Sequence, residues 1–260
     1  MEKIGTISNT RSILEKYDLQ ALKKYGQNFL VDQNVILNIV ESAKLTKDSC
    51  VIEIGPGLGS LTEHLAKQAG KVIAYEIDER FIPILEQLPI ELHHADFLKV
   101  DLEKLLNTID HQEIVVVSNL PYYITTDLLT KIMLESDRID RVVCMMQREV
   151  ATKLTDPKES SPLKLLMEVS GKVSYEFTVS KNVFIPAPNV DSAILKIEMN
   201  HTDLDLKGFY SFLQDCFKQR RKTLNNNLKK YPKEIFGKID PKLRAEQLSL
   251  EDLIYLFERI

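Results

Sequence analysis

The chain has 260 residues, of which 44% are hydrophobic and 28% are charged, and its formal net charge is −4. This length suits one large domain with a small one, and the composition is typical of a soluble globular protein. No apolar run approaches the ~20 residues that span a bilayer, and the N-terminus lacks the apolar core of a signal peptide, so we expect a cytoplasmic protein. The three cysteines and five histidines follow no metal-binding spacing, so we expect no metal site.

Short apolar runs rich in β-branched residues alternate with helical patterns between residues 51 and 197. We expect strands at Val51–Ile54, Val72–Ile77, Ile90–His93, Ile114–Val117, Arg141–Met146 and Ser192–Ile197. Helices are expected between them, for example over Leu61–Gln68 and Phe81–Leu88. Such alternation predicts an α/β fold, in which a parallel sheet carries helices on both faces. From about Leu204 the strand signals stop, and helical patterns continue to Ile260.

The stretch VIEIGPGLGSLTEHLA, from Val51 to Ala66, predicts a strand that enters a glycine loop and a helix that leaves it. Gly55, Gly57 and Gly59 would let the backbone turn tightly and approach a ligand closely, although a tight strand–helix turn alone would also use them. A dinucleotide site requires glycine at the sixth position of the loop, which here is Ser60. The GxGxG pattern instead resembles the Rossmann-like methyltransferases that use S-adenosylmethionine (SAM).

Acidic residues follow the next two predicted strands. Glu76 ends the second strand and would accept hydrogen bonds from the ribose hydroxyls of the cofactor, but Asp78 is a close competitor that spacing does not exclude. Asp96 follows the third strand and would accept a hydrogen bond from the exocyclic amine of the cofactor adenine. Each acid alone would fit a solvated loop, but the carboxyl ends of the strands in an open α/β sheet form its usual ligand site.

The fourth predicted strand ends in Asn119, Leu120, Pro121 and Tyr122. The side-chain oxygen of Asn119 and the backbone carbonyl of Leu120 or Pro121 would accept hydrogen bonds from a planar amine such as that of adenine, which favours the transition state of methyl transfer. Pro121 fixes the backbone, and Tyr122 can stack on the base. An Asn-Pro turn that only ends a strand is the alternative. The motif indicates amino methylation as the reaction class, because methyltransferases of DNA adenine, rRNA adenine and protein glutamine share it.

Four further stretches resemble the rRNA adenine N6-dimethyltransferases: Lys23–Asp32 (KKYGQNFLVD), Asn182–Ile194 (NVFIPAPNVDSAI), Phe217–Leu228 (FKQRRKTLNNNL) and Arg244–Leu253 (RAEQLSLEDL). The last two resemble the C-terminal domain of the branch of this family that acts on the small ribosomal subunit. The resemblance implies a Rossmann-like, class I SAM-dependent methyltransferase sheet followed by a small all-α domain. It places the SAM-binding catalytic domain at residues 1–203, with an N-terminal helical arm, and a helical RNA-binding domain at residues 204–260.

The resemblance also implies roles for individual residues. The SAM-binding residues would be Gln27, Asn28, Leu30, Gly55, Gly57, Gly59, Glu76, Asp96 and Asn119. The catalytic residues that hold the target adenine would be Asn119, Leu120, Pro121, Tyr122 and Phe184. Phe184 would stack on the target base opposite Tyr122; its own pattern suggests a core position, but Pro186 and Pro188 favour a loop. Tyr123 stands where many members have asparagine, a difference at the rim of the predicted pocket.

A basic segment from Lys218 to Lys233 contains no acidic residue, although the whole chain is acidic. Its charge is therefore segregated, and net charge alone does not exclude RNA binding. The RNA-binding residues would be Lys218, Arg220, Arg221 and Lys222. A solvated helix face with no ligand is the alternative.

We expect SAM-dependent dimethylation of N6 in two adjacent adenines, in the loop of a 3′-terminal helix of 16S rRNA, as part of small-subunit biogenesis. The expected partners are this rRNA and the immature small ribosomal subunit, without a membrane or a metal, and a monomer is the default oligomeric state. Three alternatives stay open: a large-subunit rRNA adenine methyltransferase of the macrolide-resistance type, a protein-glutamine methyltransferase, and a ribosome-assembly factor that binds RNA without catalysis.

Overall fold

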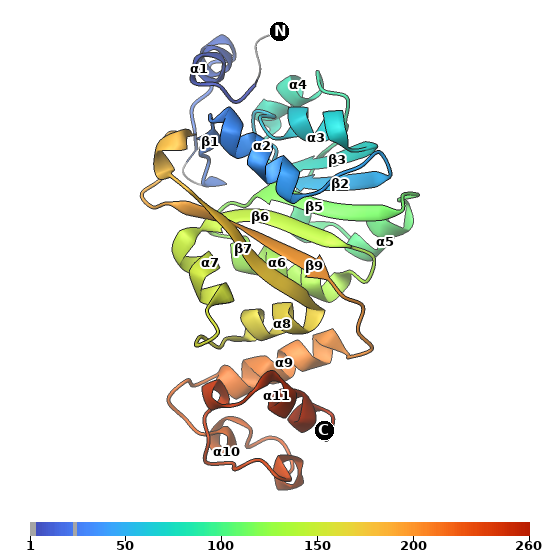
Figure 1. The fold of residues 1–260 in the computed structure, drawn as a ribbon, viewed down its shortest axis with the longest axis vertical. Helices are drawn as coiled ribbons and strands as arrows, with labels where there is room; N and C mark the ends of the chain where they lie inside the picture. The colour runs from blue at the N-terminus through green and yellow to red at the C-terminus, as the bar shows by residue number, and fades with distance from the viewer. Residues whose placement is uncertain (1–3, 23–24) are drawn as a thin grey trace.

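The computed structural model describes residues 4–22 and 25–260 (Figure 1). Lys23 and Lys24, the first residues of the predicted N-terminal signature, lie outside the described residues. The strands are β1 (Phe29–Leu30), β2 (Ser49–Ile54), β3 (Lys71–Glu76), β4 (Glu91–His94), β5 (Glu113–Asn119), β6 (Arg141–Gln147), β7 (Gly171–Val179), β8 (Phe184–Ile185) and β9 (Ser192–Met199). The helices are α1 (Ile7–Lys16), α2 (Gln33–Ser42), α3 (Thr62–Gln68), α4 (Ile82–Leu85), α5 (Leu102–Asn107), α6 (Thr125–Glu135), α7 (Arg148–Thr155), α8 (Pro162–Ser170), α9 (Leu206–Phe217), α10 (Leu224–Asn227) and α11 (Leu250–Phe257). Within the described part of the chain, no helix has the length and apolar character of a membrane span.

Seven strands form the central sheet, in the order β4-β3-β2-β5-β6-β9-β7. The strands from β4 to β6 are parallel, as the alternation of strands and helices predicts. β9 is antiparallel to β6 and pairs on its other side with β7, so the prediction of an entirely parallel sheet is wrong at this edge. The sequence pattern does not predict β7, because most of its residues are only half-buried and form no apolar run.

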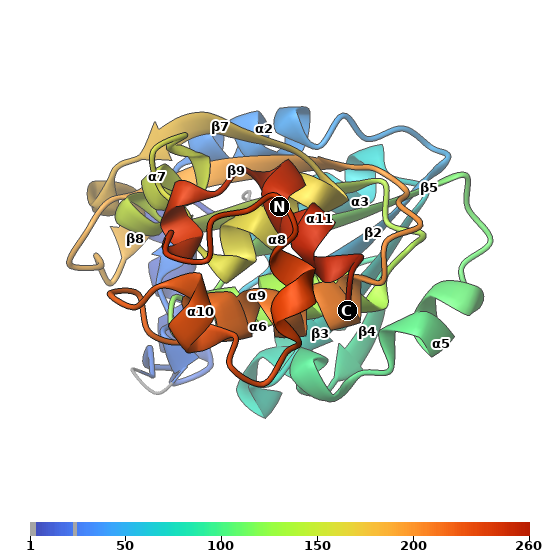
Figure 2. The ribbon, with the colours of Figure 1, turned by 90° about the horizontal axis from the view of Figure 1, so that it is seen from below.

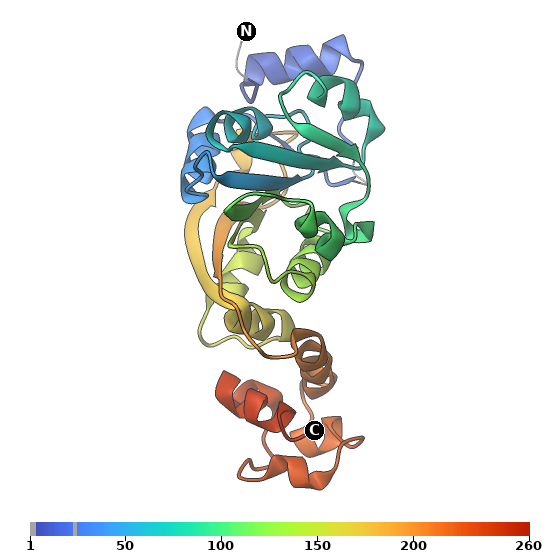
Figure 3. The ribbon, with the colours of Figure 1, turned by 90° about the vertical axis from the view of Figure 1, so that its right-hand side faces the viewer.

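The strands of the sheet alternate their side chains between two cores, as strands that are covered on both faces must. In β5, Ile114 and Val116 face the core that α5 and α6 cover, whereas Val115 and Val117 face the core that α2 and α3 cover. Figure 3 shows α2 (blue) and α6 (green) on opposite sides of the sheet. The near-continuous apolar run of β5 follows from this double burial.

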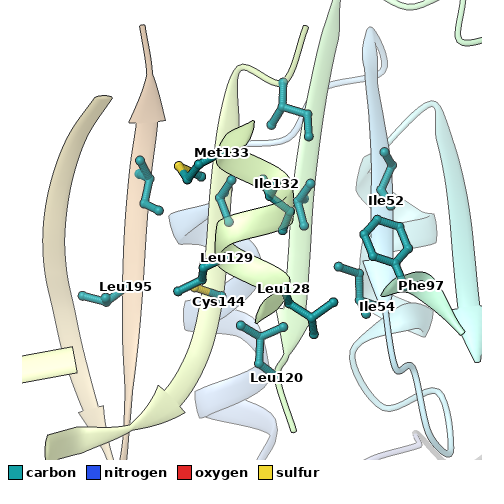
Figure 4. Packing of buried hydrophobic residues seen from close by; sticks show 14 of the residues in the cluster. Ile52, Ile54, Phe97, Leu120, Leu128, Leu129, Ile132, Met133, Cys144 and Leu195 are labelled. Atoms are coloured by element: carbon teal, nitrogen blue, oxygen red, sulfur yellow. The ribbon is translucent and has the colours of Figure 1, made fainter. Parts of the chain in front are cut away.

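The larger core reaches the loop that follows β5. In Figure 4, Leu128, Leu129 and Ile132 of α6 lie over the sheet, and Leu120 lies beside Leu128 at one end of this core. Leu120 is only 2% exposed, and its N–H donates to the carbonyl of Met145 in β6 at 3.1 Å. These contacts fix the loop after β5 against the sheet.

The C-terminal helices lie at one end of the molecule (Figures 1 and 2). Their buried side chains form a hydrophobic core. Phe209, Phe212 and Leu253 are fully buried within it. Leu165 of α8 also belongs to this cluster, and α9 contacts both α6 and α8. The helical segment is thus packed directly on helices of the sheet domain.

The N-terminal segment packs beside the glycine loop. Ile13 and Leu14 of α1 contact a small cluster that contains Leu58 and Phe81. Leu58 belongs to the glycine loop, and Phe81 ends the short 3-10 helix after β3. The packing of α1 therefore places this N-terminal arm at the edge of the sheet where the strands β2 and β3 end.

Candidate active site

The strand order reverses between β2 and β5, which are neighbours in the sheet although β3 and β4 lie between them in the chain. In open α/β sheets a ligand site forms at such a point, outside the carboxyl ends of the strands. A cavity of about 290 Å³ lies there. It is lined by parts of residues 25–30, by the glycine loop after β2 and by the segments that follow β3, β4 and β5.

Two of the three loop glycines line the cavity. Gly55 has φ +69°, and a Cβ added to it would meet no atom within 4 Å, so its backbone leaves room for a ligand. Gly57 donates its N–H to the Glu76 carboxylate at 3.0 Å. Gly59 does not line the cavity, and a Cβ there would lie 2.8 Å from a methyl group of Leu88. The position of Gly59 indicates a packing role in place of the predicted cofactor contact.

The structure separates the two competing acids after β3. Glu76 lines the cavity and is 4% exposed, and its second oxygen accepts from the Asp78 N–H at 2.8 Å. Burial raises the pKa of Glu76, and the backbone N–H groups that it accepts from act in the opposite direction. Asp78 is not part of the cavity wall, and its carboxylate pairs with Arg80 at 2.5 Å. Glu76 is therefore the better candidate for the ribose.

Asp96 reaches the cavity from the end of β4. Its Oδ1 accepts from the backbone N–H of Leu98 at 3.1 Å, which fixes the start of a short 3-10 helix, Phe97–Lys99. Phe97 and Leu98 also line the cavity. A carboxylate beside apolar side chains is the environment that the predicted contact with an adenine amine requires.

The arm is the N-terminal part of the chain that precedes α2. Its predicted SAM-binding residues, Gln27, Asn28 and Leu30, all line the cavity. The amide nitrogen of Gln27 donates to Asp78 at 2.7 Å, and its oxygen accepts from a backbone N–H of the arm at 2.8 Å. Arg80 donates to Asp78 and to Gln27. We call the side chains of Gln27, Asp78 and Arg80 the latch, because they tie the arm to the end of β3. The sequence offers Asp78 only as a rival ribose ligand and gives no sign of this second role.

The loop after β5 brings two hydrogen-bond acceptors to the cavity. The amide nitrogen of Asn119 donates to the Asn28 carbonyl at 3.4 Å, and no donor to its Oδ1 occurs in the part of the chain that the structure describes. The Pro121 carbonyl already accepts from the Ile124 N–H at 3.2 Å and from a threonine hydroxyl of α6 at 3.1 Å. Both of its lone pairs are thus in use, so the Leu120 carbonyl is the better of the two backbone acceptors that the sequence leaves open.

Tyr122 and Phe184, the two predicted stacking residues, lie in different environments. Tyr122 lines the cavity, and its hydroxyl lies 2.6 Å from the hydroxyl of Ser192 in β9, a contact that the sequence did not predict. Phe184 is 4% exposed and does not line the cavity. It lies in β8 opposite Leu30 of β1, so the prediction of a loop is wrong at this residue. To stack on a base, the Phe184 side chain would have to leave the core.

Glu53 is a buried acid at the cavity that the sequence patterns do not predict. It belongs to β2, lines the cavity and is 1% exposed. Its Oε2 has no hydrogen-bond partner within the described residues. Burial, and to a smaller extent the charge of Glu76, raises the pKa of Glu53 to about 8, so the carboxyl stays largely protonated at neutral pH. In the sequence, Glu53 stands out as an acidic residue inside the apolar run VIEI, and this is the feature that could have indicated a buried acid.

The wall of the cavity fits an adenosyl ligand. Gly55 leaves open space next to the backbone, and Glu76 and Asp96 offer carboxylates to hydroxyl and amine donors. The Oδ1 of Asn119, which accepts no hydrogen bond from the described residues, adds an uncharged acceptor. Among residues 4–22 and 25–260, no group of three or more His, Cys, Asp or Glu side chains is placed to hold a metal ion.

The predicted RNA-binding residues lie at the end of α9, outside the cavity wall. Lys218, Arg220, Arg221 and Lys222 are all exposed, and among the described residues none of them forms an ion pair. The nearby Asp215 pairs instead with Lys230 at 2.6 Å. These cations are therefore available to an anionic partner.

Comparisons with known proteins agree with the geometry of the site. The model of the family "Ribosomal RNA adenine dimethylase" matches residues 19–260. A "Ribosomal RNA small subunit methyltransferase A" from Staphylococcus epidermidis is 40% identical, over 98% of this chain and 95% of its own length. The protein of the same name from Staphylococcus haemolyticus is 39% identical, with the same coverage of both chains.

Two solved structures resemble the whole fold. A dimethyladenosine transferase from Plasmodium falciparum has a TM-score of 0.74 at 24% identity, over 87% of this chain and 95% of that chain. The 23S rRNA methyltransferase ErmE has a TM-score of 0.66 at 29% identity, over 89% of this chain and 99% of that chain. These likenesses confirm the predicted Rossmann-like methyltransferase sheet with a helical C-terminal part.

Proposed function

This chain belongs to the ribosomal RNA adenine dimethylase family, and from that premise we propose that it dimethylates N6 of two adjacent adenines in small-subunit rRNA, with SAM as the methyl donor. The target is the loop of the 3′-terminal helix of 16S rRNA, and the reaction belongs to small-subunit biogenesis in the cytoplasm. The partner is the immature small subunit, bound by a monomer of this chain. Support for the small subunit comes from relatives at 39% and 40% identity whose names specify it.

The placement of Asn119 is the observation that carries the mechanism. Its amide nitrogen is held by the Asn28 carbonyl, which leaves Oδ1 for the target amine. Oδ1 and the Leu120 carbonyl would accept the two N–H groups of adenine N6. As the nitrogen loses its conjugation with the ring and becomes pyramidal, these hydrogen bonds strengthen, so they favour the transition state over the ground state.

The residues that would hold SAM come from separate segments of the cavity wall. When bound, SAM supplies the electrophilic methyl group. Glu76 would accept from the ribose hydroxyls and Asp96 from the adenine amine, while Gly55 would allow the backbone to approach. The wall near the methionine end would be formed by Gln27, Asn28 and Leu30.

The mechanism requires no strong base, because a nitrogen that has gained a methyl group and a positive charge loses its proton readily. Tyr122 would stack on the target base, with its hydroxyl fixed by Ser192. We assign stacking to Tyr122 alone, since Phe184 is buried in the core. The rate then depends on how well Asn119 and Tyr122 align the amine.

The proposed reaction can be tested with radiolabelled SAM and immature small subunits that lack the modification. After digestion of the RNA, the label should be found in N6,N6-dimethyladenosine. Label confined to large-subunit RNA would contradict the choice of subunit, and label in protein would indicate a glutamine methyltransferase. Tight binding of the subunit without any label would indicate an assembly factor.

Replacing Asn119, whose side-chain amide would hold the target amine, should impair methyl transfer more than rRNA binding. Asn119→Ala should lower turnover by roughly 10²–10³-fold, since it removes one transition-state hydrogen bond, and should leave rRNA affinity nearly unchanged. Asn107→Ala, at an exposed position of α5, is the matched control and should retain full activity. Equal turnover in Asn119→Ala and wild type would refute the mechanism.

A further inference from the structure

Tyr123 is a large side chain at the cavity that the mechanism above does not use. It lines the cavity although it is 56% exposed, which places it at the mouth. The residues on either side of it are fixed, Tyr122 by the hydroxyl of Ser192 and Ile124 by its N–H bond to the Pro121 carbonyl. The loop therefore holds Tyr123 in place, although no hydrogen bond of its hydroxyl occurs within the described residues.

The Tyr123 ring reaches across the mouth to the arm. A Cβ on Gly26 would lie 3.6 Å from Cδ1 of Tyr123, so the backbone of the arm lies directly beside the ring. Gly26 has φ +61°, in the left-handed region that favours glycine. Tyr25 and Gly26 also line the cavity. Tyr123 thus bridges the loop after β5 and the arm on one side of the mouth.

Tyr123 lines the same cavity as Glu76 and Asp96. Burial raises the pKa of Tyr123, and the charges of Asp96, Tyr25 and Glu76 raise it further, so these groups are its electrostatic neighbours. Glu76 and Asp96 are the carboxylates assigned to the ribose and the adenine of the cofactor. Among the described residues no other ring pairs with Tyr123, so its face is available to a ligand.

We propose that Tyr123 is a cofactor-binding residue, whose ring packs on the nucleoside end of SAM and closes the mouth between the loop after β5 and the arm. This inference rests on the proposed function, because it takes the adenosyl group as the occupant. A nucleobase of the RNA is the competing occupant. Tyr123 lines the same cavity as Glu76 and Asp96, the carboxylates proposed for the cofactor, and this shared cavity favours the cofactor.

The first test compares two variants of Tyr123 in their affinity for SAM, measured by calorimetry on the full chain. Tyr123→Ala should weaken SAM binding by roughly five- to a hundredfold, which is the range for loss of an aromatic ring that stacks on a base. Tyr123→Phe keeps the ring and should bind SAM within about twofold of wild type, by the same argument. At saturating SAM, the KM of Tyr123→Ala for RNA should stay within about twofold of wild type, because the lost ring contacts the cofactor and not the RNA.

The second test uses the absence of tryptophan from the chain. Tyr123→Trp creates a single tryptophan at the mouth, whose fluorescence adenosine alone should quench, whereas methionine alone should not. Tyr255→Trp, in α11 of the C-terminal segment, is the matched control and should respond to neither.

The outcomes separate this inference from the proposed function. Unchanged SAM affinity in Tyr123→Ala, with a raised KM for RNA, would assign the ring to a nucleobase of the substrate and overturn the inference while leaving the proposed function intact. Quenching of Tyr123→Trp by RNA but not by adenosine would do the same. A wild-type chain that bound no SAM would contradict the proposed function and this inference together.

Discussion

Glu53 is a carboxyl group that the fold buries inside an apolar strand at the cavity. In the folded chain its pKa is about 8, whereas the ordinary value is 4.5, so between these two pH values the folded state binds a proton that the unfolded state has lost. The stability that this proton contributes is complete below pH 4.5, declines as the pH rises and is lost above about pH 8.

Removing the ionisable group should flatten this pH dependence. Glu53→Gln should gain stability relative to wild type as the pH rises from 5 to 8, by at most about 1.4 kcal/mol per pH unit. Urea unfolding at several pH values measures the effect, and Glu86→Gln at an exposed position is the control. A constant difference between Glu53→Gln and wild type over this range would show that Glu53 is ionised in the folded protein.

A second prediction about single residues concerns the latch, which consists of the side chains of Gln27, Asp78 and Arg80. Asp78→Ala removes the acceptor that holds both Arg80 and the Gln27 amide, so it should loosen the arm and weaken SAM binding. Loss of charged hydrogen bonds of this kind also costs about 1.5–3 kcal/mol of unfolding free energy. Calorimetry with SAM and thermal unfolding test both effects against Glu79→Ala, which changes an exposed neighbour. Wild-type SAM affinity in Asp78→Ala would mean that the arm does not depend on the latch.

At the scale of elements, the glycine loop must leave space for a ligand at Gly55 and pack closely against Leu88 at Gly59. Gly55 and Gly59 both have positive φ, so alanine at either position should destabilise the chain by about 1–2 kcal/mol. Only Gly55→Ala places a methyl group in the cavity, so only this variant should also weaken SAM binding. Gly59→Ala presses instead on Leu88, and it should bind SAM normally once folded. Unfolding and SAM titration of the pair measure this difference, and equal loss of SAM affinity would contradict it.

The elements that the sequence predicts correctly are those whose burial leaves a pattern. β5 is buried on both faces and appears as an apolar run, whereas β7 is mostly half-buried at the sheet edge and leaves no run. β1 and β8 are two residues long and exist only because they pair with each other. A pairing between segments so far apart in the chain produces no local periodicity, whereas the prolines Pro186 and Pro188 favour a loop at Phe184.

The residues of the site also divide into those that a local sequence pattern predicts and those that depend on contacts between distant segments. The placement of Glu76, Asp96 and Asn119 at the cavity could be predicted because each lies at the end of a recognisable strand, and the strand ends meet at one edge of the sheet. The bond between Gln27 and Asp78 spans 51 residues of the chain. The bond between Tyr122 and Ser192 spans 70 residues. Neither partner leaves a signal in its own neighbourhood, so these contacts became evident only in three dimensions.

At the scale of the whole molecule, the cavity and the exposed basic side chains after α9 lie in different regions. The cavity lies at the ends of the strands, and the exposed cations Lys218, Arg220, Arg221 and Lys222 lie beyond α9. The acidic net charge of −4 therefore conceals a local basic surface. Because phosphate contacts release counterions, binding through this surface should weaken steeply as salt increases.

Charge reversal tests the basic surface. Arg220→Glu with Arg221→Glu should weaken binding to the small subunit and lower the slope of log affinity against log salt by about 2, since two phosphate contacts are lost. SAM affinity should not change. Reversal of Lys104 and Lys172, which are exposed elsewhere on the molecule, controls for net charge. An equal loss in both double variants would mean that overall charge, and not this surface, governs binding.

The packing of Leu165 in the C-terminal core affects how the helical end of the chain could be exchanged. This side chain belongs to α8 of the sheet domain, is 4% exposed and lies in the core of the C-terminal helices. A foreign helical end grafted after β9 would have to accommodate Leu165 and the face of α8 around it. Chimaeras that exchange the helical end should therefore carry α8 with it, because the unit that packs together is larger than the segment that we propose to contact RNA.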